Sequence, residues 1–424
     1  RGRPGTLDPR SRPRPASYPG RPTDPHPRGA PITATTDDAS PRATRALLAD
    51  RGFGPYLVGN FVSSTGNWFQ NVAAAYVVFE LTRSSTLVGV VGVLQFGATL
   101  LLAPAAGAAA DRVDRRWLMV GAQVVSFLGA AALAVVVLAV GIDGLPGAWP
   151  VFAATAVIGL GYAVTIPTTQ AIVPSLVPRV DLPQAIALGS VSFNLARAVG
   201  PGVAGLTLAA AGAGVAFGVN ALTFAAFALV MVFIRPHRPT RPERVEGADR
   251  SIRAGVRLAA RDPFIVRALL VTVALGFATD PVNTLAPALA DRHGAGSAVV
   301  GYVGSAFGGG AVVASVVLNR LRAAFPRTRL AEVGYATLAV GMLVVATAPT
   351  GGVALVGMAL AGTGFLLAVT TVNGELQYRL DEQVRGRVMA LWSVAFLGFR
   401  PVAALVDGAV ADMAGVGAGV GGSA

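Results

Sequence analysis

The stretch GAAADRVDRR, residues 107–116, carries five charged side chains in its last six positions and lies between two long apolar runs. The chain around it is 53% hydrophobic and only 13% charged, and its mean hydropathy is +0.61. From Phe53 onward, apolar segments of bilayer-crossing length, about 20 residues at ~1.5 Å each, follow one another along the chain. This composition predicts an all-α integral membrane protein, and the charged stretch predicts a tight turn between two of its spans.

Eleven segments have the length and composition of a span. They are 55–79, 86–110, 117–140, 149–172, 186–211, 214–234, 264–288, 297–319, 329–348, 352–375 and 387–410. The expected domains are a disordered Arg/Pro-rich cytoplasmic tail over 1–50, a six-helix half over 51–234, a cytoplasmic linker over 235–262 and a second half of about five complete helices over 263–424. The residues after Val410 are too few and too rich in glycine for a span, so a twelfth helix is expected to be missing or truncated.

The 34 basic residues are all arginines, and their placement along the chain is asymmetric. Only Arg83 and Arg292 fall on the side of the spans opposite to the charged stretch, and only Arg197 and Arg400 fall deep inside spans. Because positively charged short loops stay on the cytoplasmic side, this pattern predicts a cytoplasmic N-terminus and a multi-pass protein of the cell (inner or plasma) membrane. The formal charge of +12 is then a topology signal and gives no reason to expect a nucleic-acid partner.

The chain also contains a weak internal repeat. Residues 159–197 align with residues 362–400 without a gap, with nine identities in 39 positions. The segments SVSFNLAR (190–197) and SVAFLGFR (393–400) both end on an arginine at the same depth of a span. This correspondence predicts two homologous halves, in which the fourth and fifth helices match the tenth and eleventh.

The turn at 107–116 resembles the G-x-x-x-D-R-x-x-R-R loop of the major facilitator superfamily. The segments NWFQNVAAAYVVFELT (67–82), 166–205 and RGRVMALWSVAFLG (385–398) are similar to its enterobactin-exporter and macrolide-efflux-like branch, the transmembrane secretion effectors. The resemblance implies a major-facilitator fold of two six-helix halves, here with the last helix missing or truncated, and the activity of a secondary transporter.

The resemblance also assigns roles to two groups of residues. The turn is expected to form a cytoplasmic latch that involves Gly107, Asp111, Arg112, Arg115 and Arg116. The segment ARAVGPGVAG is similar to the Gly-Pro motif of drug and proton antiporters in the fifth helix, and its matching residues are Gly200, Pro201, Gly202 and Gly205. Many proton-coupled members carry an arginine in the fourth helix, whereas this chain has none there and offers Tyr162 instead.

Polar side chains at bilayer depth are the candidates for the transport path, because a charge or an amide that faces lipid is costly. They are Asn67, Trp68, Gln70, Asn71, Tyr162, Arg197, Asp280, Asn283 and Arg400. For the amides the alternative is packing between helices, for the arginines a structural pair, and for Asp280 a wet position at the outer mouth. A lone carboxylate inside the membrane, such as Asp280, is a natural site for a coupling proton. Pro281 and Pro287 are expected to open the backbone of the helix near it.

Cysteine is absent and the three histidines lie outside the spans, so neither thiolate catalysis nor a metal site or other cofactor is expected. The expected spans contain no close pair of carboxylates, which would have suggested an enzyme. The predicted function is secondary active transport, namely proton-coupled efflux of a small amphipathic molecule such as a siderophore, a macrolide or another natural product, by a monomer in contact with membrane lipid. The alternatives are an importer or uniporter of a small solute and a truncated membrane protein that does not transport.

Overall fold

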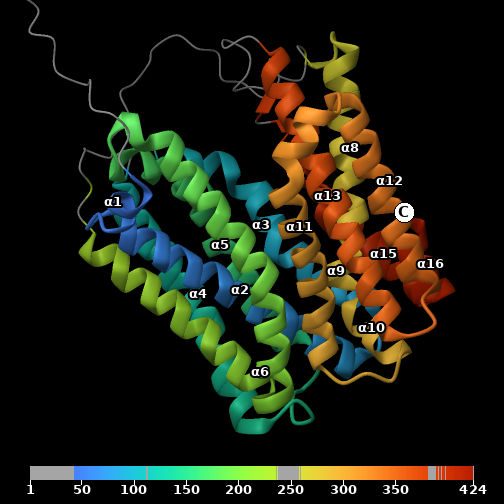
Figure 1. Ribbon diagram of the computed structural model, residues 1–424. Helices are drawn as coiled ribbons and strands as arrows, with labels where there is room; N and C mark the ends of the chain where they lie inside the picture. Colours follow the sequence, from blue (N-terminus) through green and yellow to red (C-terminus); the bar gives the residue numbers. More distant parts are fainter. Residues whose placement is uncertain are drawn as a thin grey trace, which may run out of the picture. The chain divides into compact units, whose positions relative to one another are not determined.

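The computed structural model describes residues 43–110, 113–234, 236, 257, 259–380, 388–389, 391–392, 394–396 and 398–423, with backbone alone at 100, 103–110 and 319. All regular secondary structure in these ranges is helical (Figure 1). This confirms the prediction of an all-helical membrane protein.

The first half of the chain forms long helices joined by short loops. They are α2 (Phe53–Thr82), α3 (Ser85–Ala110), α4 (Arg115–Val140), α5 (Trp149–Leu176) and α6 (Leu182–Phe233), with a short 3₁₀ turn at Arg179–Asp181 before α6. Helix α6 has 52 residues, too many for one span, and it is broken at Gly212, where φ is +81° and ψ is 172°. Glycine adopts this backbone conformation without a steric penalty, so α6 consists of two helices that meet at Gly212.

The second half begins with a broken helix. Its helices are α8 (Pro263–Thr279), α9 (Pro281–Thr284), α10 (Ala286–Arg292), α11 (Ala298–Ala324), α12 (Arg327–Thr347), α13 (Gly351–Arg379), α15 (Arg400–Ala414) and α16 (Val416–Gly422). The first break follows Asp280, and proline is the next residue; Pro287 lies just after the second break. Because proline has no N–H to donate to the preceding turn, both breaks lie where the sequence predicts an opened backbone.

Eight helices in the described part of the chain are long and apolar enough to cross a membrane, and the 55 residues of Arg179–Phe233 count as one of them. Helix α2, which is more polar, has 30 residues, and α3 has 26, so both also exceed the length of a bilayer core at ~1.5 Å per residue. For the first ten expected spans the helix ends lie within about five residues of the expected ends, although the span 264–288 is divided into α8, α9 and α10. The last span was expected from 387, whereas α15 begins at Arg400.

The predicted tail needs one correction. Residues Thr44–Leu48 form helix α1, whose Leu47 is completely buried against the body of the protein, so the folded part begins before residue 51. An apolar Leu-Leu pair next to an arginine-rich segment was the signal for this short helix. The expected tail over 1–42 and most of the expected linker over 235–262 lie outside the described residues.

At the other terminus, α15 runs to Ala414 and α16 follows after Gly415, whose φ is +89°. The seven residues of α16 pack on α12 and α15 and are too few to cross a bilayer.

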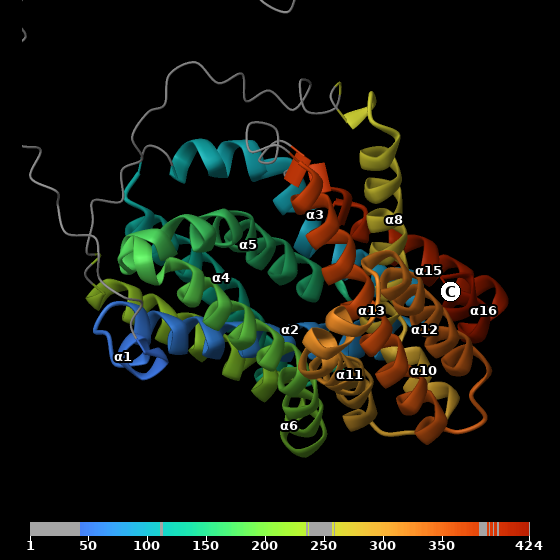
Figure 2. The same cartoon turned by 45° about the horizontal axis from the view of Figure 1, so that its top comes forward.

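The helices from the two parts of the chain meet along two seams. Helix α3 packs on α15. Helix α6 packs on α11, and Figures 1 and 2 show these two helices side by side. Both seams depend on glycines. A Cβ atom added at Gly301 would collide with the backbone of Pro201, and one added at Gly89 would collide with the backbone of Ala404. Close backbone approach of this kind is typical of helices that associate in lipid.

Both seams lie near the end of the bundle at which α2 passes into α3. We call the end at which α2 passes into α3 the Arg83 end, and the end at which α3 passes into α4 the Arg115 end.

Candidate functional site

A cavity of about 310 Å³ lies between the two parts of the chain. Its wall comes from α2, α3, α5 and α6 on one side, and from the α8–α9 break and α15 on the other. The lining residues are Ser64, Asn67, Trp68, Asn71, Ala75, Val88, Val91, Gly92, Gln95, Phe96, Tyr162, Ile166, Phe193, Arg197, Asp280, Asn283, Thr284 and Arg400. The volume is that of a site for a small organic molecule.

Helical spacing explains why these residues meet. Helix α2 contributes residues 64, 67, 68, 71 and 75, which follow the i, i+3, i+4, i+7, i+11 pattern of one helix face. Helix α3 contributes residues 88, 91, 92, 95 and 96 in the same way. The cavity is therefore the place where one face of α2, which is mostly polar, and one face of α3, which is apolar apart from Gln95, are turned inward.

Eight of the nine transport-path candidates line this cavity, and Gln70 does not. The eight are Asn67, Trp68, Asn71, Tyr162, Arg197, Asp280, Asn283 and Arg400. Gln70 is about a third of a turn away from the lining face of α2, and it is buried with an exposed fraction of 2%. The Asn220 Nδ2 group donates a hydrogen bond to Gln70 Oε1 at 3.4 Å. This is the packing contact between helices that the sequence left open as the alternative.

Each of the two arginines of the cavity wall lies over one or two aromatic rings of the opposite part of the chain. The Cζ atom of Arg197, on α6, is 5.2 Å from the ring centroid of Phe307 and 4.9 Å from that of Phe365. The Cζ atom of Arg400, on α15, is 5.0 Å from the ring centroid of Phe96. The two arginines that match in the internal repeat therefore make matching cation–π contacts along the α6–α11 and α3–α15 seams.

Asp280 lies at the break between α8 and α9, on the cavity wall. Its Oδ2 atom accepts a hydrogen bond from the Thr284 hydroxyl at 2.5 Å, and Arg400 lies within electrostatic range. A second carboxylate, Asp407, is also buried, interacts electrostatically with Asp280, and has no hydrogen-bond partner for its Oδ2 atom within the described ranges. Asp407 was not among the transport-path candidates, although its i+7 spacing from Arg400 places both on one face of α15.

Several polar atoms of the wall make no hydrogen bond within the part of the chain that the structure describes. They are Asn67 Oδ1, Asn71 Oδ1, Gln95 Nε2 and Arg400 Nε. Buried polar groups are normally paired, so these amides and this guanidinium are available to a bound molecule.

The turn motif is only partly described. Asp111 and Arg112 lie outside the described residues, and Gly107 is described only as backbone within α3. Arg115 Nη1 donates to the carbonyl of Ala171 at 3.0 Å, and Arg116 donates to the carbonyls of Met231, at 2.9 Å, and Val232. These two arginines therefore bind carbonyl groups of α5 and α6, within the first half of the chain.

The Gly-Pro motif lies between the cavity and α11. A Cβ atom added at Gly200 would lie 2.5 Å from Trp68 Cδ1, one at Gly202 would lie 2.6 Å from Ser305 Oγ, and one at Gly205 would lie 2.7 Å from the carbonyl oxygen of Ala298. The small residues thus let α6 approach both the cavity wall and the backbone of α11.

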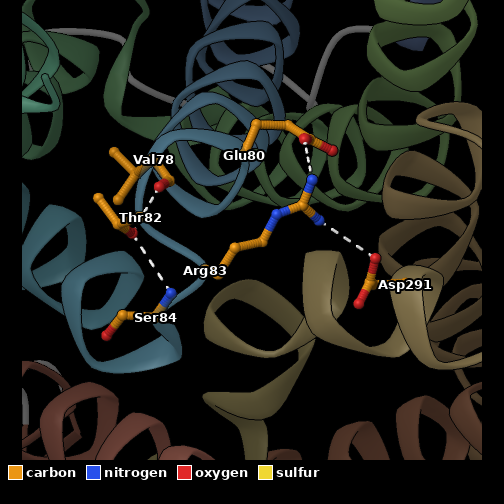
Figure 3. Close-up of polar contacts among 6 residues, drawn as sticks. All are labelled: Val78, Glu80, Thr82, Arg83, Ser84 and Asp291. Carbon is orange, nitrogen blue, oxygen red and sulfur yellow. Dashed lines mark hydrogen bonds and ion pairs between the residues drawn. The ribbon is translucent and has the colours of Figure 1, made fainter.

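Polar contacts join the two parts of the chain at the Arg83 end. Figure 3 shows Arg83 between Glu80 and Asp291, with Nη2 at 2.6 Å from Glu80 Oε2 and Nη1 at 3.2 Å from Asp291 Oδ1. Arg83 is the non-glycine residue with positive φ (+52°) in the described ranges, and it ends α2.

Asp412, on α15, binds the start of α3. Its Oδ1 atom accepts a hydrogen bond from the Ser85 N–H at 2.7 Å, and Oδ2 accepts from the Thr86 N–H at 3.0 Å. The hydroxyls of Ser84 and Thr86 each donate to Oδ2 at 2.7 Å. A carboxylate from one part of the chain therefore completes the first turn of a helix in the other part.

Comparisons with known proteins agree with this architecture. The family described as transmembrane secretion effector matches residues 43–424. The enterobactin exporter EntS of Shigella boydii is 28% identical over 360 residues, which are 82% of each chain. The staphyloferrin A transporter of Staphylococcus aureus is 30% identical over 154 residues, 36% of this chain and 38% of the relative.

Solved structures with the same fold have low sequence identity. A bacterial homologue of the iron transporter ferroportin in an inward-facing state superposes with a TM-score of 0.68 at 14% identity, covering 90% of this chain and 97% of that one. A bacterial homologue of the lysosomal transporter Spinster, inward-facing and unoccupied, gives 0.67 at 13% identity, with 85% and 82% coverage.

A bundle of membrane-crossing helices around a central cavity, with this fold, defines a membrane transporter of the major facilitator superfamily and not an enzyme. Within that superfamily, the chain belongs to the transmembrane secretion effector family. The family resemblance that the sequence motifs predicted is thereby confirmed, and the protein is a multi-pass membrane protein.

Proposed function

We propose that the protein exports a small amphipathic molecule by alternating access, with siderophores as the first class of candidate substrate. The observation that carries this proposal is the central cavity, which is lined by eight polar or charged candidates and bounded by the α3–α15 and α6–α11 seams. The named functions of two relatives, an enterobactin exporter and a staphyloferrin A transporter, support the substrate class.

We further propose that the chain is built from two repeated halves. Residues 85–97 of α3 and 297–309 around the start of α11 align without a gap and are identical at six of 13 positions, including three glycines. The paired seams and the paired arginine–ring contacts support this plan. In this two-half plan, the second part of α6 is the sixth helix of the first half, and it packs against α4. The short α16 packs against α12 and so takes the corresponding place of a twelfth helix.

In this proposal the Arg83 end is the extracellular end, and the N-terminus is cytoplasmic. The structure then corresponds to a state in which the cavity is closed toward the outside. The support is the distribution of arginines, which concentrate at the Arg115 end.

This topology makes a labelling prediction. A cysteine in place of Asp143, in the loop between α4 and α5, is expected to react with a membrane-impermeant maleimide added to intact cells. A cysteine in place of Val113, at the opposite end, is expected to react only after the membrane is made permeable. Both positions are exposed, and the chain has no native cysteine that would give background labelling. The reverse pattern of labelling would invert the topology.

Proton coupling is proposed to run through Asp280. A carboxylate on the cavity wall, within electrostatic range of Arg400 and Asp407, changes the charge that faces a bound molecule when it gains or loses a proton. The proposed network uses neither a histidine nor an arginine in α5.

The test of function is accumulation of labelled siderophores and macrolides in cells that carry the full chain or an empty vector. Export predicts lower accumulation of at least one compound with the protein present, and proton coupling predicts that a protonophore removes the difference. Higher accumulation with the protein present would favour the alternative of an importer. A difference that survives the protonophore would contradict proton coupling but not export.

A further inference from the structure

We propose that the cavity binds an aromatic carboxylate, with the anionic group of the substrate held between Arg197 and Arg400; this inference rests on the proposed function. The transport proposal defines a site for a small amphipathic molecule, and the charges of the wall now specify the chemistry of that molecule.

Arg197 is the first part of the argument. Its guanidinium lies over the rings of Phe307 and Phe365, whose centroids are 5.6 Å apart, and it lines the cavity. No carboxylate lies within ion-pair distance of Arg197 among the residues that the structure describes. Two ring faces attract the cation but give its N–H groups nothing to bond, because those groups point outward in the guanidinium plane. A partly buried arginine on the cavity wall with unpaired N–H groups favours an anionic ligand.

Arg400 is the second part. Its Nε atom is buried and makes no hydrogen bond to a described residue, and its guanidinium lies over Phe96. Asp280 is within electrostatic range, but the contact falls short of an ion pair, and the Asp280 carboxylate already accepts a hydrogen bond from Thr284. Arg400 therefore keeps unused donors close to a carboxylate that offsets part of its charge.

The sum of charges selects the sign of the ligand. Two guanidinium groups and one carboxylate line the cavity, so the wall is positive when Asp280 is ionised and more positive when it is protonated. Both arginines line the same cavity, so their like charges repel each other across it. A carboxylate placed between them would relieve this repulsion and fill the fork geometry of either guanidinium.

The other residues of the cavity wall indicate the shape and polarity of the rest of the ligand. Trp68, Phe96 and Phe193 offer aromatic surface, and the unpaired amides of Asn67 and Asn71 lie on the same face of α2 as Trp68. A planar apolar group with a few polar substituents fits such a wall, and the cavity volume of about 310 Å³ is that of a small aromatic acid.

The test compares naphthoate with its neutral isostere naphthamide, by titration calorimetry on the full chain in nanodiscs of phosphatidylcholine, a lipid without net charge. The wild type is expected to bind the acid at least about tenfold more tightly than the amide. Arg197→Gln is expected to lose about tenfold or more in affinity for the acid and to keep its affinity for the amide. Arg197→Lys, which keeps the charge, should recover part of the loss.

The matched control is Arg267→Gln, which removes an exposed arginine of α8 whose Nε donates to the carbonyl of Pro263. It is expected to bind both probes as the wild type does. Equal binding of acid and amide by the wild type, or of neither probe, would overturn the anion site. Equal loss of both probes in Arg197→Gln would overturn it as well, because Arg197 would then only hold the two halves together. In each of these three outcomes, efflux measured in cells that carry the wild type would still support the proposed transport function.

Discussion

Proton-driven efflux is expected to fall to the level of an empty vector when Asp280 is replaced by asparagine. The amide has nearly the same shape as the carboxylate and still accepts a hydrogen bond from Thr284, but it cannot take up or release a proton. Substrate should still bind and should still exchange across the membrane when it is present on both sides. The measurement is uptake into inverted membrane vesicles with and without an imposed proton gradient, next to exchange without a gradient.

The control for this variant is Asp291→Asn. Asp291 is an exposed carboxylate of the same half, paired with Arg83 outside the cavity, and exposed ion pairs contribute little to stability. Transport by Asp291→Asn should remain close to that of the wild type. Full gradient-driven uptake by Asp280→Asn would remove Asp280 from the coupling mechanism and would direct attention to Asp407.

Leucine in place of Gly301 is expected to prevent closure of the α6–α11 seam. A Cβ atom alone would already collide with the backbone of Pro201 and would lie 2.7 Å from the Cα atom of Gly205. Overpacking typically costs about 1–3 kcal/mol, which would shift the balance between closed and open states of the Arg83 end roughly 5- to 150-fold toward open. Transport should fall, and a cysteine at Ala75 on the cavity wall should become reactive toward an impermeant maleimide added from outside.

Gly309→Leu is the matched control, because this glycine lies on the same helix and a Cβ atom there would have no neighbour within 4 Å. It should transport and label like the wild type. If Gly301→Leu behaved like Gly309→Leu in both measurements, the α6–α11 seam would not be a gate.

The sequence predicted the spans well because hydropathy is a local property of the chain. Expected and observed helix ends agree within about five residues except at the start of the last span, and the breaks around Asp280 lie where Pro281 and Pro287 predicted them. Candidates on one face of a helix were also found, since i+3 and i+4 spacing follows from the helix itself. Gln70 and Asn71 are neighbours with similar side chains, and only a view of the neighbouring helix could tell that one faces the cavity and the other faces Asn220.

Contacts between the two parts of the chain were beyond the reach of the sequence. The rings over Arg197 come from residues more than 100 positions away, and nothing local in α11 or α13 marks Phe307 and Phe365 as its partners. Asp407 was left without an assigned role because its depth in the bundle depends on how α15 packs on α3. Such information exists only in the tertiary arrangement, and mutual packing of apolar helices leaves little trace in composition.

The hydrogen bonds from the start of α3 to Asp412 imply that the transport cycle changes secondary structure. When the Arg83 end separates, the Ser85 and Thr86 amides lose their carboxylate acceptor, while the Ser84 hydroxyl still accepts from the Leu87 N–H at 3.3 Å. The first turn of α3 then depends on a single, longer local bond and is expected to fray. The rate of amide hydrogen exchange at these two residues would therefore report the state of the transporter without any label on the protein. Exchange is expected to be slow in the closed state and fast in the open one.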